Sequence, residues 1–186
     1  LLVGLAMKGE RPDEIVGFAT AMRGRAVRIP VEPGTTVDLC GTGGDGSGSF
    51  NISSAAALVA AACGATVAKH GNRSVSGRRG SADVFEALGV TLSATPEVLA
   101  QCLTQAGIAF LFAPAMHPSM RNVVSVRKDL AVRTAFNLLG PLTNPTRPAH
   151  QIVGVPRPEL TELIARALAL LGARRAWVVH GADGLD

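Results

Sequence analysis

Two polar segments of this chain carry groups that could bind phosphates and a metal ion. Residues 41–54 read Gly-Thr-Gly-Gly-Asp-Gly-Ser-Gly-Ser-Phe-Asn-Ile-Ser-Ser, and residues 69–73 read Lys-His-Gly-Asn-Arg. The glycines leave backbone N–H groups uncovered beside a predicted helix N-terminus, where unpaired N–H groups and the helix dipole attract anions. The second segment adds two cations, an imidazole and a carboxamide at the same edge. Together the segments predict a pocket for a ligand with several phosphates and a metal.

Other interpretations of the glycine-rich segment fit less well. Residues 41–46 match the Gly-x-Gly-x-x-Gly pattern of dinucleotide-binding loops, but no acidic residue follows about 20 residues later at a strand end. A nucleotide-hydrolase loop would end in Gly-Lys-Ser/Thr, and none is present. A loop rich in glycine by chance would not be expected to gather a carboxylate, a carboxamide and several hydroxyls, at Asp45, Ser49, Asn51, Ser53 and Ser54.

Strand and helix patterns alternate along most of the chain. The predicted strands are short apolar runs at residues 36–40, 65–68, 108–112, 151–155 and 176–179. The predicted helices lie between them, at residues 51–62, 81–88, 95–106, 118–127, 133–139 and 158–171, with Asn51 and Ser81 as N-caps. This order predicts an α/β fold with a mostly parallel sheet flanked by helices. Ligands of such sheets bind at the carboxyl ends of strands, where both polar segments fall.

The N-terminal part follows a different pattern. Residues 1–28 predict a partial helical domain of two helices joined by a turn at residues 9–11, and the proline-containing residues 29–35 predict a linker. Residues 36–186 are then the α/β domain. The chain starts inside a helical pattern without an initiator Met and stops after a predicted strand, so we interpret it as a fragment of a longer chain.

Composition and charge set broad limits. The 186 residues are 47% hydrophobic and 17% charged, which is typical of a soluble globular protein. A net charge of +4 suits an anionic ligand, because several of the basic residues flank the polar segments. Cys40, Cys63 and Cys102 are too few and too widely spaced for a disulfide framework, so each is expected to be reduced and buried, in a cytoplasmic protein. The sequence contains no unbroken apolar run of about 18 residues, so no membrane span is predicted.

Six ordered motifs of the chain resemble the anthranilate phosphoribosyltransferases. They lie at residues 41–45 (GTGGD), 51–54 (NISS), 69–73 (KHGNR), 80–84 (GSADV), 112–118 (FAPAMHP) and 133–145 (RTAFNLLGPLTNP). The resemblance implies a nucleoside phosphorylase/phosphoribosyltransferase-like fold, usually a homodimer formed through the helical part. It also implies transfer of a phosphoribosyl group from phosphoribosyl pyrophosphate (PRPP) to the amine of anthranilate, with Mg²⁺ as cofactor and release of pyrophosphate.

The resemblance also assigns site residues by position. The expected catalytic residues are Lys69 and Asp45. The expected PRPP-binding residues are Gly41, Gly44, Asp45, Ser49, Asn51, Ile52, Ser53, Ser54, Lys69, His70, Gly71, Asn72, Arg73 and Ser81. Anthranilate is expected against Gly41, His70, Asn72, His117 and Pro141, with its carboxylate facing Arg127. The expected magnesium ligands are Ser53 and Asp186.

One segment departs from the family pattern. Residues 74–80 read Ser-Val-Ser-Gly-Arg-Arg-Gly, where the family pattern leads us to expect Ser at Gly77 and Lys at Arg78. The change is expected to affect substrate affinity, and an arginine fork could replace the lysine contact to phosphate. Asn137 and Asn144 are interpreted as caps of helices and turns, and Phe110, Phe112 and Phe136 as core residues.

Two other functions remain open on the sequence. A nucleic-acid-binding relative could keep the fold and a basic face, but the complete motif at residues 69–72 and Arg127 disfavour it, so nucleic acid is not an expected partner. A pyrimidine-nucleoside phosphorylase would share the two-domain plan. Its phosphate loop carries a Lys-x-Ser/Thr-Gly-Gly pattern, and no such lysine precedes Gly43.

Overall fold

The computed structural model describes residues 1–32, 34–43, 50–74 and 79–182. Its helices are α1 (Leu2–Lys8), α2 (Pro12–Arg23), α3 (Ile52–Ala62), α4 (Ser81–Ala87), α5 (Pro96–Gln105), α6 (Ala113–Met116), α7 (Arg121–Leu130) and α8 (Glu159–Leu170). Short 3₁₀ turns are η1 (Pro118–Met120), η2 (Ala135–Asn137) and η3 (Gly140–Leu142). The strands are β1 (Val37–Gly41), β2 (Val67–Gly71), β3 (Ile108–Phe112), β4 (His150–Gly154) and β5 (Arg175–Val179).

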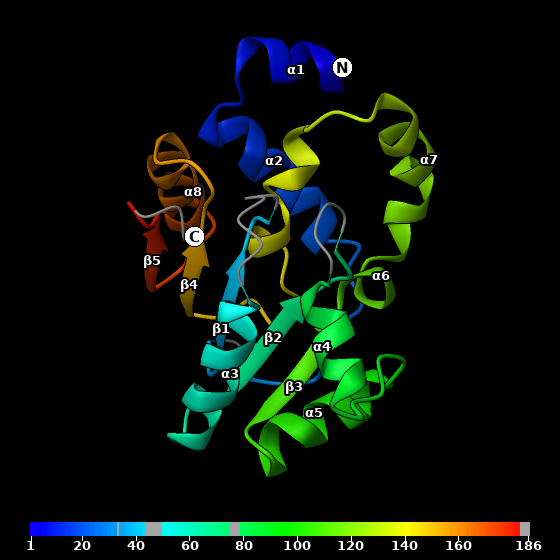
Figure 1. Ribbon diagram of the computed structural model, residues 1–186, viewed down its shortest axis with the longest axis vertical. Coiled ribbons are helices and arrows are strands. Elements are labelled where there is room, and N and C mark those ends of the chain that lie inside the picture. The colour runs from blue at the N-terminus through cyan, green and yellow to red at the C-terminus, as the bar shows by residue number, and fades with distance from the viewer. Residues whose placement is uncertain (33, 44–49, 75–78, 183–186) are drawn as a thin grey trace.

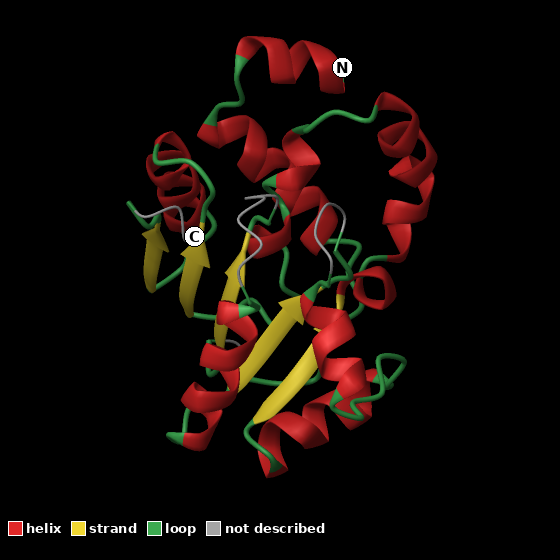
Figure 2. Ribbon diagram, viewed as in Figure 1, coloured by secondary structure: helices red, strands yellow, loops and turns green. Residues whose placement is uncertain are grey.

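The strands form one parallel sheet in the order β3-β2-β1-β4-β5. Figure 2 shows their arrows pointing the same way, toward the side of the molecule that carries α2. The chain proceeds outward from β1 to β2 and β3 on one side, and then returns to place β4 and β5 on the other side of β1. The predicted parallel α/β fold is therefore confirmed, and its topological switch point lies between β1 and β4.

Side chains alternate between the two faces of the sheet along each strand, so each face has apolar side chains for helices to cover. Leu39 on β1 and Val67 on β2 pack against Ala57 of α3, whereas Cys40 packs on the other face in the cluster that contains α8. Helix α2 contributes Ile15 and Ala19 to this second cluster, so the N-terminal helical part shares a core with the α/β part. The division of the chain into domains at residues 28 and 35 stays a prediction.

Part of one sheet face carries exposed apolar side chains. Ile152 and Trp177 are paired in register on β4 and β5, and Trp177 is 64% exposed. Val179 follows two residues later on β5 and is also exposed. This face lies beyond the part that α3 covers (Figure 1).

Several predicted elements differ from the structure. The predicted helix at residues 133–139 is only the η2 turn, because Thr134 is extended and Asn137 Oδ1 accepts a hydrogen bond from its N–H group. The helix predicted from residue 118 starts as the η1 turn and continues as α7 to Leu130. Strand β2 begins at Val67 and includes Lys69, His70 and Gly71. Gly80 is the N-cap of α4, where its N–H donates to Asp83 Oδ2, and Ser81 is the first helical residue.

All three cysteines are free thiols, but only Cys40 is buried. The prediction of burial is wrong for Cys63, which caps the solvent-exposed end of α3. Within the described residues, no helix is long and apolar enough to cross a bilayer.

Candidate active site

The predicted site residues gather at the carboxyl edge of the sheet. β1 ends at Gly41, β2 ends at Gly71, and β3 leads through α6 to His117. Figure 1 shows the yellow segment around residue 140 beside the same strand ends. Parallel α/β proteins bind ligands at this edge, next to the switch point, because loops from several strands meet there.

The start of the glycine-rich segment is fixed by two neighbours. Thr42 N–H donates to Gly154 O at 3.0 Å, which extends the pairing of β1 with β4. Gly43 has a positive φ of 68°, and its carbonyl accepts from both terminal nitrogens of Arg133 at 3.4 Å. Gly44, Asp45, Ser49 and Asp186, which are predicted site residues, lie outside the described residues.

The first turn of α3 follows this segment. Asn51 is the N-cap as predicted, but its side chain donates to Arg79 O at 3.4 Å instead of capping the helix. Ile52 and Ser53 are half-buried. Ser54 Oγ is buried and, like Thr42 Oγ1, has no hydrogen-bond partner within the described residues. Buried polar atoms of this kind usually meet water or a ligand, so the N-terminus of α3 can accept an anion.

The second polar segment is more buried than its sequence predicts. Lys69 is 2% exposed, and its Nζ donates to His70 O at 3.3 Å. The sequence predicts a cation at the open edge, but residue 69 lies inside β2, whose first four residues are all buried. Asn72 follows the strand end, and Asn72 O accepts from Ser81 Oγ at 3.3 Å. The catalytic assignment of Lys69 stays a prediction.

Gly71 and Gly80 allow these segments to approach each other. A Cβ on Gly71 would collide with Ser81 Oγ and lie 2.8 and 2.9 Å from two ring carbons of Phe110. A Cβ on Gly80 would collide with the backbone of residues 72–74. Glycine is therefore required at both positions by close packing, and it brings the start of α4 against the end of β2.

Arg73 is engaged by carboxylates of α4. Its Nη1 lies 2.7 Å from Asp83 Oδ1 and 2.9 Å from Glu86 Oε2, and its Nη2 lies 2.9 Å from Glu86 Oε1. Hydrogen bonds from Arg73 to Glu86 and Asp83 raise the pKa of its guanidinium above the usual value. The predicted contact of Arg73 with PRPP stays a prediction.

A pair of histidines lies where anthranilate is predicted to bind. The rings of His70 and His117 meet edge to face with centroids 5.2 Å apart. His70 Nδ1 lies 3.1 Å from Gly140 O, whereas His70 Nε2 and both ring nitrogens of His117 are buried without partners in the described part of the chain. Burial lowers the pKa of His70 to about 3 and also lowers that of His117. Both rings are therefore neutral near pH 7 and can accept or donate hydrogen bonds to a ligand.

The remaining predicted anthranilate residues lie on α7 and the following segment. The guanidinium of Arg127 is half-buried and lies 5.3 Å from the ring centroid of Phe136. Pro141 is buried, and its carbonyl accepts from Gln151 Nε2 at 2.8 Å. This contact fixes the segment that follows Gly140 against β4.

Two residues important to the site's geometry were missed by sequence reasoning. Asp38 is completely buried and accepts from the N–H group of His70 at 3.2 Å. Asn144, interpreted from the sequence as a cap, is also completely buried and donates to Asp38 Oδ2 at 2.9 Å. The signal that could have revealed Asp38 is a carboxylate inside an otherwise apolar strand, since an unpaired buried charge is strongly unfavourable.

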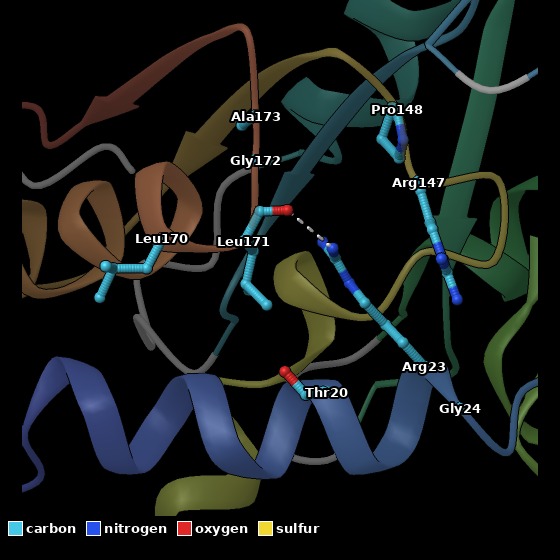
Figure 3. Close-up of a pocket in the computed structure, with 9 residues that line it drawn as sticks. All are labelled: Thr20, Arg23, Gly24, Arg147, Pro148, Leu170, Leu171, Gly172 and Ala173. Carbon is cyan, nitrogen blue, oxygen red and sulfur yellow. Dashed lines mark hydrogen bonds between the residues drawn. The ribbon is translucent and has the colours of Figure 1, made fainter.

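A cavity of about 440 Å³ lies elsewhere in the molecule (Figure 3). It is lined by the end of α2, by Arg147 and Pro148 before β4, and by residues 170–173 before β5. Arg23 crosses it and donates to Leu171 O at 3.3 Å. This cavity is at the amino ends of β4 and β5, so it is separate from the polar residues described above.

The fold and the site define a class: a parallel α/β protein with a polar site at the carboxyl edge of its sheet, beside the N-terminus of α3, of a kind that could accept an anionic ligand. Comparison with family models agrees with this class. The chain belongs to the glycosyl transferase family, because the model of that family's a/b domain matches residues 33–186.

Individual relatives confirm the resemblance seen in the sequence. The anthranilate phosphoribosyltransferase of Moorella thermoacetica is 55% identical over 185 residues, which are 100% of this chain and 55% of the relative. That of Syntrophobacter fumaroxidans is 57% identical over 182 residues, 98% of this chain and 54% of the relative. The chain thus spans about half the length of the curated relatives it matches.

Solved structures give the same result. The anthranilate phosphoribosyltransferase of Thermus thermophilus is 52% identical and superposes with a TM-score of 0.91, covering 97% of this chain and 55% of its own. The enzyme of Saccharomyces cerevisiae in complex with PRPP and Mg is 31% identical with a TM-score of 0.92, covering 100% of this chain and 53% of its own.

Proposed function

We propose that the full-length protein transfers the phosphoribosyl group of PRPP to the amine of anthranilate, with release of pyrophosphate, in tryptophan biosynthesis. The observation that carries the proposal is the meeting of two separate motifs, His70 on β2 and His117 after β3, at the carboxyl edge that also receives Gly41. Relatives of this chain bear the name of this activity, and one of them has been solved with PRPP and Mg.

The reaction needs little covalent chemistry from the protein. The bond between ribose C1 and a pyrophosphate oxygen breaks, a bond from the anthranilate nitrogen to C1 forms, and the nitrogen loses a proton. Positive charge grows on the ribose and negative charge on the leaving group, so fixed hydrogen-bond donors near the leaving group lower the barrier. The N–H groups at the N-terminus of α3 and the hydroxyls of Ser53 and Ser54 can serve this purpose.

The neutral histidine pair suits an aromatic acceptor. The rings of His70 and His117 can pack against an aromatic ring, and His70 Nε2 and the two ring nitrogens of His117, which lack partners among the described residues, can bond its polar groups. Arg127 supplies a cation for the carboxylate of anthranilate. A guanidinium matches a carboxylate in two parallel hydrogen bonds, which fixes the orientation of the acceptor.

Mg²⁺ fits the chemistry of the oxygen groups in this site. The Ser53 hydroxyl is a hard oxygen ligand of the type that Mg²⁺ accepts together with substrate phosphates and water. Asp186 is the other ligand proposed. When bound, the ion neutralises charge on the leaving pyrophosphate.

We also propose a homodimer formed through the helical part, in a cytoplasmic enzyme. Met7 of α1 is 84% exposed and offers an apolar side chain that a second copy could cover. The three free thiols fit a reducing compartment. Sedimentation equilibrium of the full-length protein tests the dimer, and a monomer at micromolar concentration would contradict it.

The activity is tested by following the loss of anthranilate fluorescence with PRPP and Mg²⁺. We expect consumption by the full-length protein that stops when the metal is chelated and resumes when Mg²⁺ is restored. No consumption, together with salt-sensitive binding to single-stranded DNA, would contradict the proposal and favour a nucleic-acid-binding relative. Phosphorolysis of a pyrimidine nucleoside without PRPP would instead indicate a phosphorylase.

A further inference from the structure

The pairing of β1 with β2 is much shorter than the other strand pairings of the sheet. β1 and β2 have one pair in register, Val37 with Val67, whereas β1–β4, β2–β3 and β4–β5 each have five. Figure 1 shows β2 running at an angle to β1. The sheet is therefore open between these two strands at their carboxyl ends, where the site lies.

Side chains occupy the place of the missing backbone hydrogen bonds. If the ladder continued beyond Val37, Ala68 O and the N–H group of His70 would both bond to Leu39. Instead, Ala68 O accepts from Asn144 Nδ2 at 2.8 Å, and His70 N–H donates to Asp38 Oδ1 at 3.2 Å. The same Asn144 nitrogen donates to Asp38 Oδ2 at 2.9 Å. A carboxylate and a carboxamide thus stand between the two strands.

Asn144 is held in one orientation. Its Oδ1 accepts from the N–H group of Thr146 at 3.0 Å and from Thr146 Oγ1 at 2.9 Å. Rotating the amide would exchange donors for acceptors, so Asp38 Oδ2, Ala68 O and the N–H group of Thr146 would lose this partner. Both Asn144 and Asp38 have 0% exposure, so every lost hydrogen bond would leave a buried polar atom unsatisfied.

This arrangement controls the separation of the two polar segments. The Gly41–Gly43 segment continues β1, and Lys69 and His70 belong to β2. If β1 and β2 closed into a regular ladder, both side chains of β2 would shift relative to the glycine-rich segment. Misplacing reacting groups by about 1 Å can reduce a rate about 100-fold.

We propose that Asp38 and Asn144 are a positioning pair that keeps β1 and β2 apart and thereby sets the distance between the PRPP-binding segment and the histidine that faces anthranilate. The inference rests on the proposed function for its kinetic consequence only. The opening of the sheet and its chemical cause are properties of the fold.

Three variants of the full-length protein test the pair: Asp38→Asn, Asn144→Asp and the double exchange. Asn144→Asp places two carboxylates together and removes the donor to Ala68 O. The double exchange restores a donor opposite an acceptor, because Asn at 38 can donate to Asp at 144 and still accept from His70. We expect kcat/KM to fall in both single variants and to be about tenfold higher in the double variant than in Asn144→Asp, since contacting residues couple by about 0.5–3 kcal/mol.

Two threonines give a milder test with a matched control. Thr36 Oγ1 and Thr146 Oγ1 lie 3.0 Å apart, but only Thr146 also bonds Asn144. Thr36→Val and Thr146→Val both remove the threonine pair, so Thr36→Val controls for the loss of that pair, while Thr146→Val also loses the hydrogen bond to Asn144. We expect only Thr146→Val to raise KM for PRPP and anthranilate, with Thr36→Val equal to the wild type.

Hydrogen exchange separates this inference from the proposed function. The His70 amide should exchange slowly in the wild type, faster in Asn144→Asp, and slowly again in the double variant, whether or not the protein turns over anthranilate. If the double variant restores slow exchange but neither the wild type nor any variant has activity, the positioning pair is supported and the transferase function is contradicted. Two results would overturn the positioning role. One is equal kcat/KM and equal exchange rates of the His70 amide in Asn144→Asp and the double variant. The other is equal KM values in the two threonine variants.

Discussion

His70 and His117 meet edge to face, with ring centroids 5.2 Å apart and an angle of 71° between their planes. The two residues are 47 positions apart, and they reach each other because β2 and β3 are adjacent parallel strands. Burial is the largest cause of the low pKa of His70, and the neighbouring His117 lowers it further. Two charged imidazolium rings could not share this position without strong repulsion.

The neutral state of His70 predicts an acid-sensitive fold. The unfolded chain binds a proton at His70 below pH 6.5, whereas the folded chain does so only near pH 3, so the unfolded state gains protons first. The free energy of unfolding should therefore fall as pH decreases from 6.5, by about 1.4 kcal/mol per pH unit as long as His70 stays neutral in the folded protein. Urea unfolding at pH 7 and pH 5 measures this change. His70→Asn should show a smaller difference between the two pH values, and an unchanged difference would contradict the prediction.

Arg73 could hold neighbouring segments together through its ion pairs, or it could bind a phosphate, and substitutions can distinguish these two roles. If Arg73 holds the end of β2 against α4, Arg73→Ala and Glu86→Ala should raise KM for PRPP by a similar factor. If Arg73 binds a phosphate directly, only Arg73→Ala should raise it, because Glu86→Ala frees the guanidinium. We expect the first result, since three hydrogen bonds join Arg73 to Asp83 and Glu86. Steady-state kinetics with varied PRPP decide between the outcomes.

Gly71→Ala should be strongly destabilising. The added methyl group would meet Ser81 Oγ and the ring of Phe110, and overpacking of this kind costs about 1–3 kcal/mol. Gly17→Ala in α2 is the matched control, because nothing lies within 4 Å of its added Cβ. It should stabilise the helix by about 0.5–1 kcal/mol. Thermal unfolding of both variants measures the difference, and equal midpoints would show that the strand end can relax.

Arg127→Lys tests recognition of the acceptor carboxylate. Lysine keeps the charge but lacks the planar fork and the stacking on Phe136, so KM for anthranilate should rise while KM for PRPP changes little. Loss of a charged hydrogen bond worth about 1.5–3 kcal/mol corresponds to about tenfold or more. Lys128→Ala, at the exposed neighbouring position, is the control. Equal effects of the two substitutions on anthranilate would remove Arg127 from the site.

Much of the fold and the edge that carries the site followed from local pattern. Apolar runs of four or five residues separated by amphipathic helices predict a parallel sheet, and polar residues after strand ends must then share one edge. For that reason the proximity of Gly41, His70 and His117 could be anticipated. Helix starts were also readable where a local bond defines them, as at Thr95, whose Oγ1 accepts from the N–H group of Val98.

The errors occurred where contacts distant in sequence decide the outcome. The segment around Phe136 has a helical pattern, but it folds as short turns because it must bring Gly140 to His70 and Asn144 to Asp38. Lys69 carries a charge typical of a surface position, yet β2 extends through it and buries it. The partners of Arg73 lie ten and thirteen residues away on α4, so its charge alone could not tell a phosphate ligand from an ion pair.

The sequence by itself determined the class of fold, the order of the strands along the chain and the identity of the motifs, because these depend on periodicity and on residue type. Only the tertiary structure decided how far β1 pairs with β2. That separation depends on Asp38 and Asn144, which are 106 positions apart and have no local signal in common. Their hydrogen bonds replace backbone pairing in the core, and a replacement of this kind exists only when the whole sheet has formed.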